Sequence, residues 1–271
     1  MNNSNRILET KLAASDSPKT YLSGKILLEY KYIMYAIIGP MRSGTTLLYR
    51  AIKDLSSDYD SNLGDEFFQT YLSNFYVYDN GDSLYQNKGS FSNKEKEIER
   101  RLFLLEKYNY RYTIKCLPQH LYQSVLDMII QKYDVIICER KNEWERFISF
   151  VLACTTFNFN RIKKTKIDTP SVRVEKQTVY DFFYLENLWK EKKEILKTRK
   201  KNYSHIFYED FIENPKKIIE SRTALKWKKN TKFFRPIYKL YGDNIKKESL
   251  IVNLDEVTEW YRLQKNHEVQ G

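Results

Sequence analysis

The chain has 271 residues, of which 42% are hydrophobic and 15% aromatic, so it can bury the core of one sizeable domain. Its formal net charge is +11 and its pI is about 9.2, which favours an anionic partner such as a nucleotide, a polyanionic substrate, a nucleic acid or a membrane surface. No run of 18 apolar residues is present, so no membrane span is expected.

The start of the chain lacks the apolar segment of a signal peptide and is polar and irregular. We therefore expect a flexible arm over 1–25 and a single domain over 26–271. The three cysteines, Cys116, Cys138 and Cys154, form no CxxC pair and no zinc spacing. This pattern favours reduced, partly buried thiols in a cytoplasmic protein, and the scattered histidines argue against a metal site.

Apolar runs alternate along the chain with segments of helical period. Strands are predicted over 30–39, 112–117, 134–140 and 204–211. Helices are predicted over 45–55, 93–108, 120–133, 142–157, 176–200 and 214–221. The alternation predicts an α/β fold with a central, mostly parallel sheet of about five strands flanked by helices. Ligands bind at the carboxyl ends of such strands, so we expect four stretches to meet at one edge: 39–46, 115–118, 140–149 and 208–210.

A glycine-rich segment, GPMRSGTT (39–46), connects the first predicted strand to the first predicted helix. Gly39 and Gly44 allow a tight turn, and the N–H groups at a helix N-terminus stabilise an anion. Thr45 replaces the lysine that contacts the outer phosphates of ATP in loops of this kind, while Arg42 supplies a cation earlier in the loop. We therefore predict a phosphate site with little preference for a triphosphate.

The segment GPMRSGTTLL resembles the 5′-phosphosulfate loop of sulfotransferases that use 3′-phosphoadenosine 5′-phosphosulfate (PAPS). The resemblance implies a P-loop-type fold, PAPS as cofactor, and adenosine 3′,5′-bisphosphate as the product released from it. It also implies that no metal takes part. The residues that it assigns to the 5′-phosphate are Arg42, Ser43, Gly44, Thr45 and Thr46. PAPS carries a single phosphate beside its sulfate, which suits a loop without the ATP-binding lysine.

The same family holds the 3′-phosphate with an arginine at a strand end and a serine on the next helix. Arg140 and Ser149 stand at the matching places. Their interval of nine residues is one longer than is usual in the family, so Lys141 stays an alternative, although the position at the strand end favours Arg140. The competing interpretation makes Arg140 a surface charge paired with the glutamates around it.

The stretch NLGDEFF (62–68) resembles the place where carbohydrate sulfotransferases of the heparan type, and some bacterial ones, carry a catalytic glutamate. Glu66 is thus the expected base, with Asp65 as its competitor. Cytosolic phenol and steroid sulfotransferases have a histidine where this chain has Cys116, which favours the glutamate-based branch. Lys115 is a loose match to a group that stabilises the transferring sulfuryl group.

Two later features complete the comparison with that family. The stretch IFYEDFIENP (206–215) resembles one in the later part of these enzymes, and we expect its carboxylates to fix neighbouring loops rather than to react. Loops 69–92 and 155–180 are expected to shape the acceptor pocket, because acceptor pockets in such folds are built by variable loops.

These features predict a sulfotransferase that moves a sulfuryl group from PAPS to a hydroxyl or amine acceptor by in-line displacement. A carbohydrate is one candidate acceptor, and no nucleic-acid partner is expected. Two alternatives stay open. One is a P-loop kinase or NTPase, which needs magnesium. The other is a basic nucleic-acid-binding protein that uses the lysine-rich stretches 192–201 and 226–235.

Overall fold

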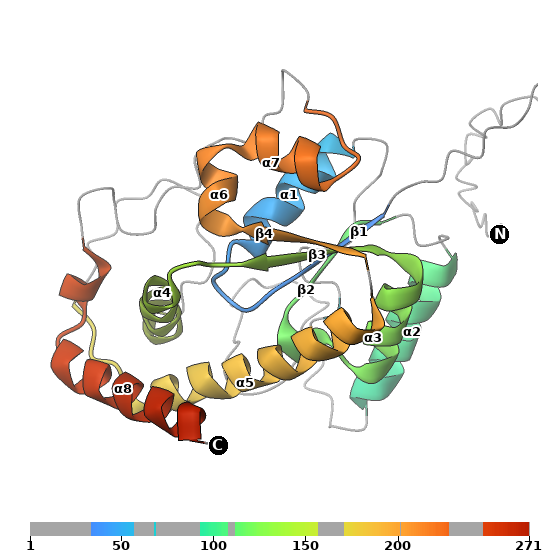
Figure 1. Ribbon diagram of the computed structural model, residues 1–271. Helices are drawn as coiled ribbons and strands as arrows, with labels where there is room; N and C mark the ends of the chain where they lie inside the picture. Colours follow the sequence, from blue (N-terminus) through green and yellow to red (C-terminus); the bar gives the residue numbers. More distant parts are fainter. Residues whose placement is uncertain are drawn as a thin grey trace, which may run out of the picture. The chain divides into compact units, whose positions relative to one another are not determined.

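The structure is a computed structural model that describes residues 34–56, 68, 93–107, 112–156, 171–200, 202–227 and 246–270. Within these ranges four parallel strands form one sheet in the order β2-β1-β3-β4 (Figure 1). The strands are β1 (Tyr35–Ile38), β2 (Ile114–Cys116), β3 (Asp134–Glu139) and β4 (Tyr203–Phe207). The α/β class and the parallel sheet are therefore confirmed, while the expected number of about five strands is not.

Helices flank this sheet and extend beyond it (Figure 1). They are α1 (Thr45–Leu55), α2 (Asn93–Lys107), α3 (Gln123–Lys132), α4 (Glu143–Thr156), α5 (Lys176–Arg199), α6 (Tyr208–Glu213), α7 (Pro215–Arg222) and α8 (Leu254–Gln270). Short 3₁₀ turns precede α3 and α8, namely η2 (Pro118–His120) and η4 (Lys247–Leu250). No helix in the described ranges is both long and apolar enough to cross a membrane.

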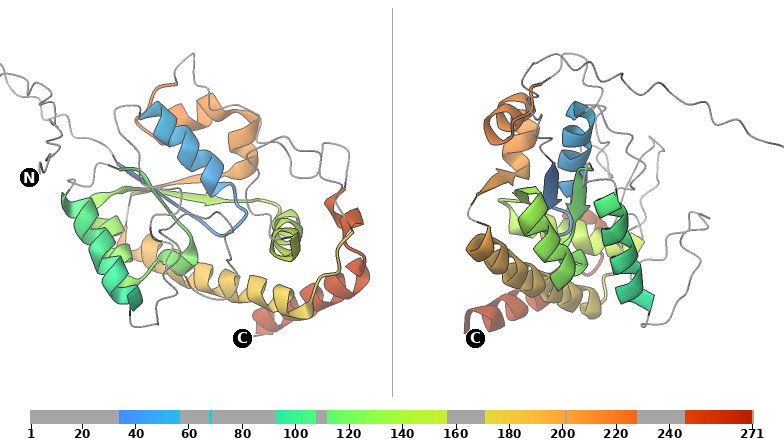
Figure 2. Two further views of the ribbon diagram at one scale, coloured as in Figure 1. Left: turned by 180° about the vertical axis from the view of Figure 1, so that it is seen from behind. Right: turned by 90° about the vertical axis from the view of Figure 1, so that its right-hand side faces the viewer.

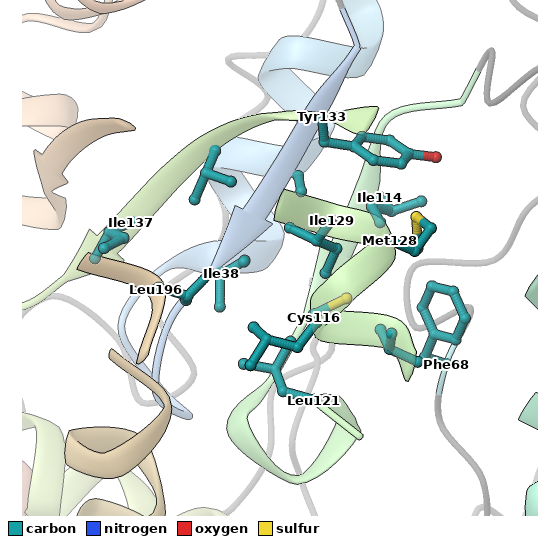
Figure 3. Packing of buried hydrophobic residues seen from close by; sticks show 14 of the residues in the cluster. Ile38, Phe68, Ile114, Cys116, Leu121, Met128, Ile129, Tyr133, Ile137 and Leu196 are labelled. Atoms are coloured by element: carbon teal, nitrogen blue, oxygen red, sulfur yellow. The ribbon is translucent and has the colours of Figure 1, made fainter. Parts of the chain in front are cut away.

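Both faces of the sheet are covered, which explains why the strands are apolar throughout. Helices α1, α6 and α7 lie on one face, and α2, α3 and α5 lie on the other (Figures 1 and 2). Successive side chains of β1 alternate between the two cores: Tyr35 and Ile37 pack with α1, whereas Ala36 and Ile38 pack with α3. In the second core, Cys116 lies close to Leu121, and Phe68 belongs to the same cluster (Figure 3).

A further core lies beyond the sheet, between α4, α5 and α8. The rings of Phe147 and Phe182 are 5.1 Å apart between centroids, and Phe147 is 4.5 Å from Tyr261. The side chain of Asn253 accepts a hydrogen bond from the backbone N–H of Val174 at 2.9 Å and donates one to its carbonyl at 3.0 Å. These contacts hold the C-terminal segment against the start of α5.

One predicted strand is wrong in its second half. The segment 204–211 was expected to be extended throughout, but the strand ends at Phe207 and α6 begins at Tyr208. Glu209 and Asp210 lie in the first turn of that helix, where negative charge is favourable, and Phe211 turns into the core beside α1. The other predicted helices and strands are present, with ends that shift by one to a few residues.

Several expectations lie outside the described residues. They are the arm over 1–25, the candidate bases Asp65 and Glu66, the loop 69–92, and most of the basic stretch 226–235. All the described residues belong to one compact unit, Tyr32–Gly271. The loop 155–180 is described only at its ends, where α4 finishes and α5 begins.

Candidate functional site

The glycine-rich segment forms a tight turn between β1 and α1, at the carboxyl edge of the sheet. Gly44 has a φ of 83° and caps α1, and Arg42 has a φ of 64°. A Cβ on Gly39 would lie 2.0 Å from the carbonyl oxygen of Cys138, and one on Gly44 would lie 2.2 Å from the ring of Tyr208. Both glycines are therefore required by close packing, and a non-glycine residue in the left-handed region costs about 1–2 kcal/mol.

Hydrogen bonds inside the turn fix its shape. The Ser43 hydroxyl donates to the carbonyl oxygen of Pro40 at 2.6 Å, and the Cys138 thiol donates to the carbonyl oxygen of Ser43 at 3.2 Å. Ser43 and Cys138 are both buried. The proton of the Ser43 hydroxyl is thus used within the turn, so any hydrogen bond from this residue to an anion has to come from its main chain.

Two of the predicted phosphate ligands are in direct contact. The Arg42 Nε atom donates to the Ser149 hydroxyl at 3.1 Å, although the two residues are 107 positions apart in the chain. Ser149 lies on α4 and is 8% exposed. The structure therefore brings the residue expected at the 5′-phosphate next to one expected at the 3′-phosphate.

The predicted catalytic lysine also contacts the turn. Lys115 is the central residue of β2 and is 1% exposed, and its Nζ donates to the Thr46 hydroxyl in the first turn of α1 at 2.9 Å. A buried ammonium group is stable only when hydrogen bonds or negative charge compensate for lost water. Its neighbour Cys116 is fully buried, and burial raises the pKa of its thiol, so this residue is unsuited to act as a base.

The side chain of Arg140 is fixed by packing, while two of its hydrogen-bond donors have no partner among the residues described. It follows β3 directly, its side chain is 10% exposed, and its guanidinium carbon lies 4.4 Å from the ring centroid of Tyr208. Within the described part of the chain, its Nε and Nη1 atoms are buried without a hydrogen-bond partner. The Glu145 carboxylate stays 3.9 Å from Nη1. Leaving a buried donor unsatisfied costs about 1–3 kcal/mol, so these atoms are poised for an acceptor.

Lys141, the alternative to Arg140, is used elsewhere. Its ammonium pairs with Asp210, and its backbone N–H donates to Glu209 Oε2 at 3.0 Å. Both partners are on α6, which agrees with the structural role expected for the carboxylates of 206–215. The geometry thus favours Arg140 as the anion ligand.

A further cation, Lys247, was not expected from the sequence. It begins η4 and is half-buried, and its pKa is lowered by burial first and then by the positive charges of Arg140 and Arg42, while Glu145 and Glu248 oppose that change. Three cations thus share one region at the edge of the sheet. In the sequence, Lys247 follows a stretch without clear periodicity, and no pattern places it near Arg140.

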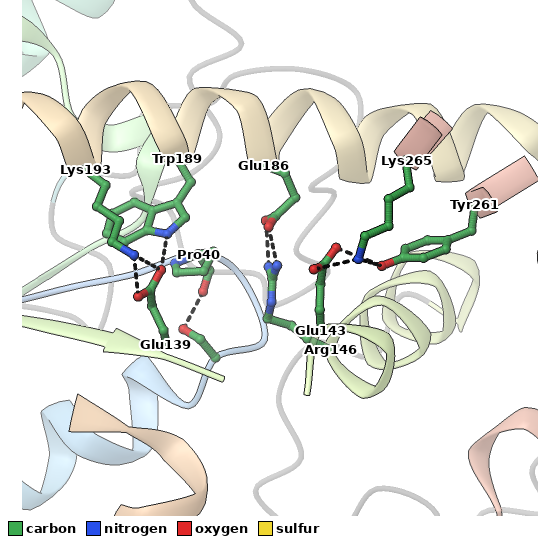
Figure 4. A network of polar contacts seen from close by, with 10 residues as sticks. Pro40, Glu139, Glu143, Arg146, Glu186, Trp189, Lys193, Tyr261 and Lys265 are labelled. Carbon is green, nitrogen blue, oxygen red and sulfur yellow. Dashed lines mark hydrogen bonds and ion pairs between the residues drawn. The ribbon is translucent and has the colours of Figure 1, made fainter. Parts of the chain in front are cut away.

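Ionic and hydrogen-bonded contacts with α5 brace this region (Figure 4). Burial raises the pKa of Glu139, but His205, whose Nε2 lies 2.8 Å from Oε2, and hydrogen bonds from Lys193 and Trp189 outweigh it and hold that pKa at about 2. The guanidinium of Arg146 on α4 makes a bidentate pair with Glu186, and both residues are buried. The end of β3 and the start of α4 are therefore fixed by α5.

A carboxyl group on α5, that of Asp181, is also partly buried. Burial raises the pKa of Asp181, although Gln177 donates to its Oδ1 at 3.0 Å, and Oδ2 is buried without a partner among the described residues. Burial and then the Asp181 charge raise the pKa of the Cys154 thiol to about 12, against the effect of Arg42. Arg42 and Asp181 are therefore both near Cys154.

The predicted base cannot be placed directly, since Glu66 and Asp65 are outside the described residues. Phe68 is described, and it is fully buried in the cluster that contains Cys116 (Figure 3). Among the described residues, no group of three or more His, Cys, Asp or Glu side chains gathers as metal ligands do.

No family model, curated protein or solved structure matches this chain. The functional assignment therefore depends on the chemistry of the site residues themselves.

Proposed function

We propose that this protein is a PAPS-dependent sulfotransferase with a P-loop-type fold, acting on a hydroxyl or amine acceptor. The observation that carries the proposal is the contact between Lys115 and Thr46. In ATP-binding loops, the hydroxyl at the position of Thr46 binds Mg²⁺. Here an ammonium group occupies the partner position of that hydroxyl, and like charge disfavours a divalent cation there.

The cations of the site suit the charge of the donor. In PAPS the 3′-phosphate is a monoester with a charge of about −1.5 to −2 at neutral pH, and the phosphate and the sulfate of the 5′-phosphosulfate group add further negative charge. Arg42 and the main chain of the turn lie where the 5′-phosphate would bind, at the N-terminus of α1. Arg140, with Lys247 nearby, supplies the donors for the 3′-phosphate, and Ser149, which contacts Arg42, is the second expected ligand. The unpaired Nε and Nη1 atoms of Arg140 support this assignment.

The reaction would be a direct displacement at sulfur. The acceptor oxygen or nitrogen forms a bond to sulfur while the bond from sulfur to the bridging phosphate oxygen breaks, and that oxygen keeps the electron pair. Glu66 takes the proton of the acceptor. Arg42 and Lys115 stabilise the negative charge that grows on the bridging oxygen, which is the usual work of preorganised donors.

The kinase or NTPase alternative is less well supported. It requires a loop lysine, which this chain replaces with Thr45, and a carboxylate at a strand end to hold magnesium. Glu139 does end β3, but its carboxylate is committed to Lys193, Trp189 and His205.

The nucleic-acid-binding alternative depended on two lysine-rich stretches. On α5, Lys193 binds Glu139 and Arg199 binds Asp127, and Lys200, directly after the helix, donates to the carbonyl oxygen of Ile130. These three cations therefore make contacts within the protein. The second stretch lies mostly outside the described residues.

A thermal-shift comparison tests the proposal. Adenosine 3′,5′-bisphosphate should raise the melting temperature without magnesium, because it binds the native state, and ATP should do little. A larger shift from ATP with magnesium would favour the kinase. A response to DNA that disappears with salt, with no response to either nucleotide, would favour the nucleic-acid-binding alternative.

The role of Glu66 has its own test. Glu66→Gln should keep the affinity for adenosine 3′,5′-bisphosphate and lower turnover of PAPS by about a hundredfold or more, the usual effect of losing a general base. Asp65→Asn is the matched control and should keep most of the turnover. The reverse result would assign the base to Asp65.

A further inference from the structure

A second polar group without a hydrogen-bond partner in the described part of the chain lies close to Arg140, and it is an acceptor rather than a donor. Glu209 is the second residue of α6, and its Oε2 accepts a hydrogen bond from the backbone N–H of Lys141 at 3.0 Å. Within the described residues, its Oε1 is buried and has no hydrogen-bond partner. The first oxygen therefore fixes the side chain, and the second is available to accept.

Independent observations place Glu209 near the turn and Arg140. Glu209 follows Tyr208, whose ring packs against Gly44 and lies under the guanidinium of Arg140. The thiol of Cys138 is within electrostatic range of both Glu209 and Arg140, and it donates to the carbonyl oxygen of Ser43. The carboxylate and the guanidinium thus lie close to the same thiol below the turn.

The two groups without hydrogen-bond partners in the described ranges require different chemical groups on a ligand. The Nε and Nη1 atoms of Arg140 are donors and need an anion, whereas a carboxylate oxygen repels an anion and needs a donor. Sulfate, which carries no proton at neutral pH, satisfies only the first. A nucleoside phosphate satisfies both, because its ribose hydroxyl and its base amino group are donors on the same molecule as the phosphate.

We infer that Glu209 is a specificity-determining residue, whose Oε1 accepts a hydrogen bond from the nucleoside part of the ligand while Arg140 holds its phosphate. The inference rests on the proposed function and adds to it a residue that was expected to be only structural. The donor is either the ribose 2′-hydroxyl or the amino group of the base.

Calorimetric titrations with three compounds distinguish the two donors. They are adenosine 3′,5′-bisphosphate, its 2′-deoxy analogue, and purine riboside 3′,5′-bisphosphate, which lacks the amino group. The wild-type protein should bind one of the two analogues about tenfold more weakly than the parent compound, since a hydrogen bond to a charged acceptor is lost. The analogue that binds more weakly identifies the donor.

The variant Glu209→Gln tests the residue itself. Its amide has one acceptor and one donor group, so it cannot accept both from Lys141 and from the ligand. The variant should bind the parent compound about tenfold more weakly and should no longer distinguish it from the weaker analogue. Asp210→Asn, which removes the neighbouring carboxylate that pairs with Lys141, is the matched control and should keep the discrimination.

Equal binding of all three compounds by the wild-type protein would overturn the inference, even if the glutamine variant failed to fold. Discrimination that persists in Glu209→Gln would also overturn it. If the wild-type protein bound none of the bisphosphates, the proposed function itself would fail, which is a separate outcome.

Discussion

Two arginines near the start of α4 differ in how their buried guanidinium groups are paired. Arg146 is 5% exposed and makes a bidentate pair with Glu186, so its charge is neutralised inside the protein. Arg140 is nearly as buried, yet its Nε and Nη1 atoms have no partner within the described residues. Natural proteins leave few buried donors unpaired. The contrast separates an arginine that is paired inside the protein from one that we propose to bind a ligand.

The largest expected effect comes from breaking the paired arginine. Arg146→Met should lower the free energy of unfolding by about 3–5 kcal/mol, because Glu186 is left buried and unpaired. Urea denaturation measures this loss. The double variant Arg146→Met with Glu186→Leu should recover most of it, and a small loss in the single variant would show that the pair adds little to stability.

Replacing Arg140, whose Nε and Nη1 atoms have no hydrogen-bond partner among the described residues, should have the opposite profile. Arg140→Met should weaken binding of adenosine 3′,5′-bisphosphate by about 2–4 kcal/mol and should not lower the free energy of unfolding of the unliganded protein. Calorimetry and urea denaturation measure the two quantities. Lys141→Met is the control and should change affinity little, since that lysine pairs with Asp210. Similar losses of affinity in both variants would contradict the assignment of Arg140.

Lys247 provides a test of the proposed anion site that depends on pH. Its pKa is lowered by burial and by Arg140 and Arg42, so part of the population is neutral at pH values near that lowered pKa. A bound phosphate raises the pKa again, and the protein then takes up a proton. Affinity should therefore fall as pH rises through this range. Titrations in buffers of different ionisation enthalpy should detect up to about one proton in the wild-type protein, and none from this group in Lys247→Met.

The smallest effect is expected at Asp181. Its raised pKa means that the folded state holds the proton more tightly than the unfolded chain, so Asp181 destabilises the fold increasingly as pH rises. Asp181→Asn should stabilise the protein at neutral pH by less than about 1 kcal/mol, because the side chain is partly solvated. The gain should vanish below about pH 4, where the carboxyl is protonated in both states. A gain that does not depend on pH would rule out this cause.

The sequence predicts the gathering of the site well, because parallel strands end at one edge of a sheet. Arg42, Lys115, Arg140 and Ser149 come from three separate segments, and the structure brings them to that edge. This rule depends only on the direction of the strands, so errors in the predicted strand ends do not change the prediction that these residues meet. Strand direction does not predict the position of Lys247, because this residue lies on a 3₁₀ turn outside the sheet.

Other features depend on tertiary contacts that no local pattern records. The strand predicted over 204–211 has suitable residues, but packing of Phe211 against the core beside α1 favours a helix from Tyr208. Helix α8 was missed, although Leu254, Val257 and Tyr261 have helical spacing. The unpaired oxygen of Glu209 becomes visible only when the contact with Lys141 is known.

The structure of the complex with adenosine 3′,5′-bisphosphate, prepared without magnesium, tests the central claim most directly. The account predicts that oxygens of the 3′-phosphate lie within hydrogen-bond distance of the Nε and Nη1 atoms of Arg140, with the 5′-phosphate at the N-terminus of α1. A complex in which the nucleotide lies elsewhere and Arg140 keeps its two unpaired atoms would contradict it.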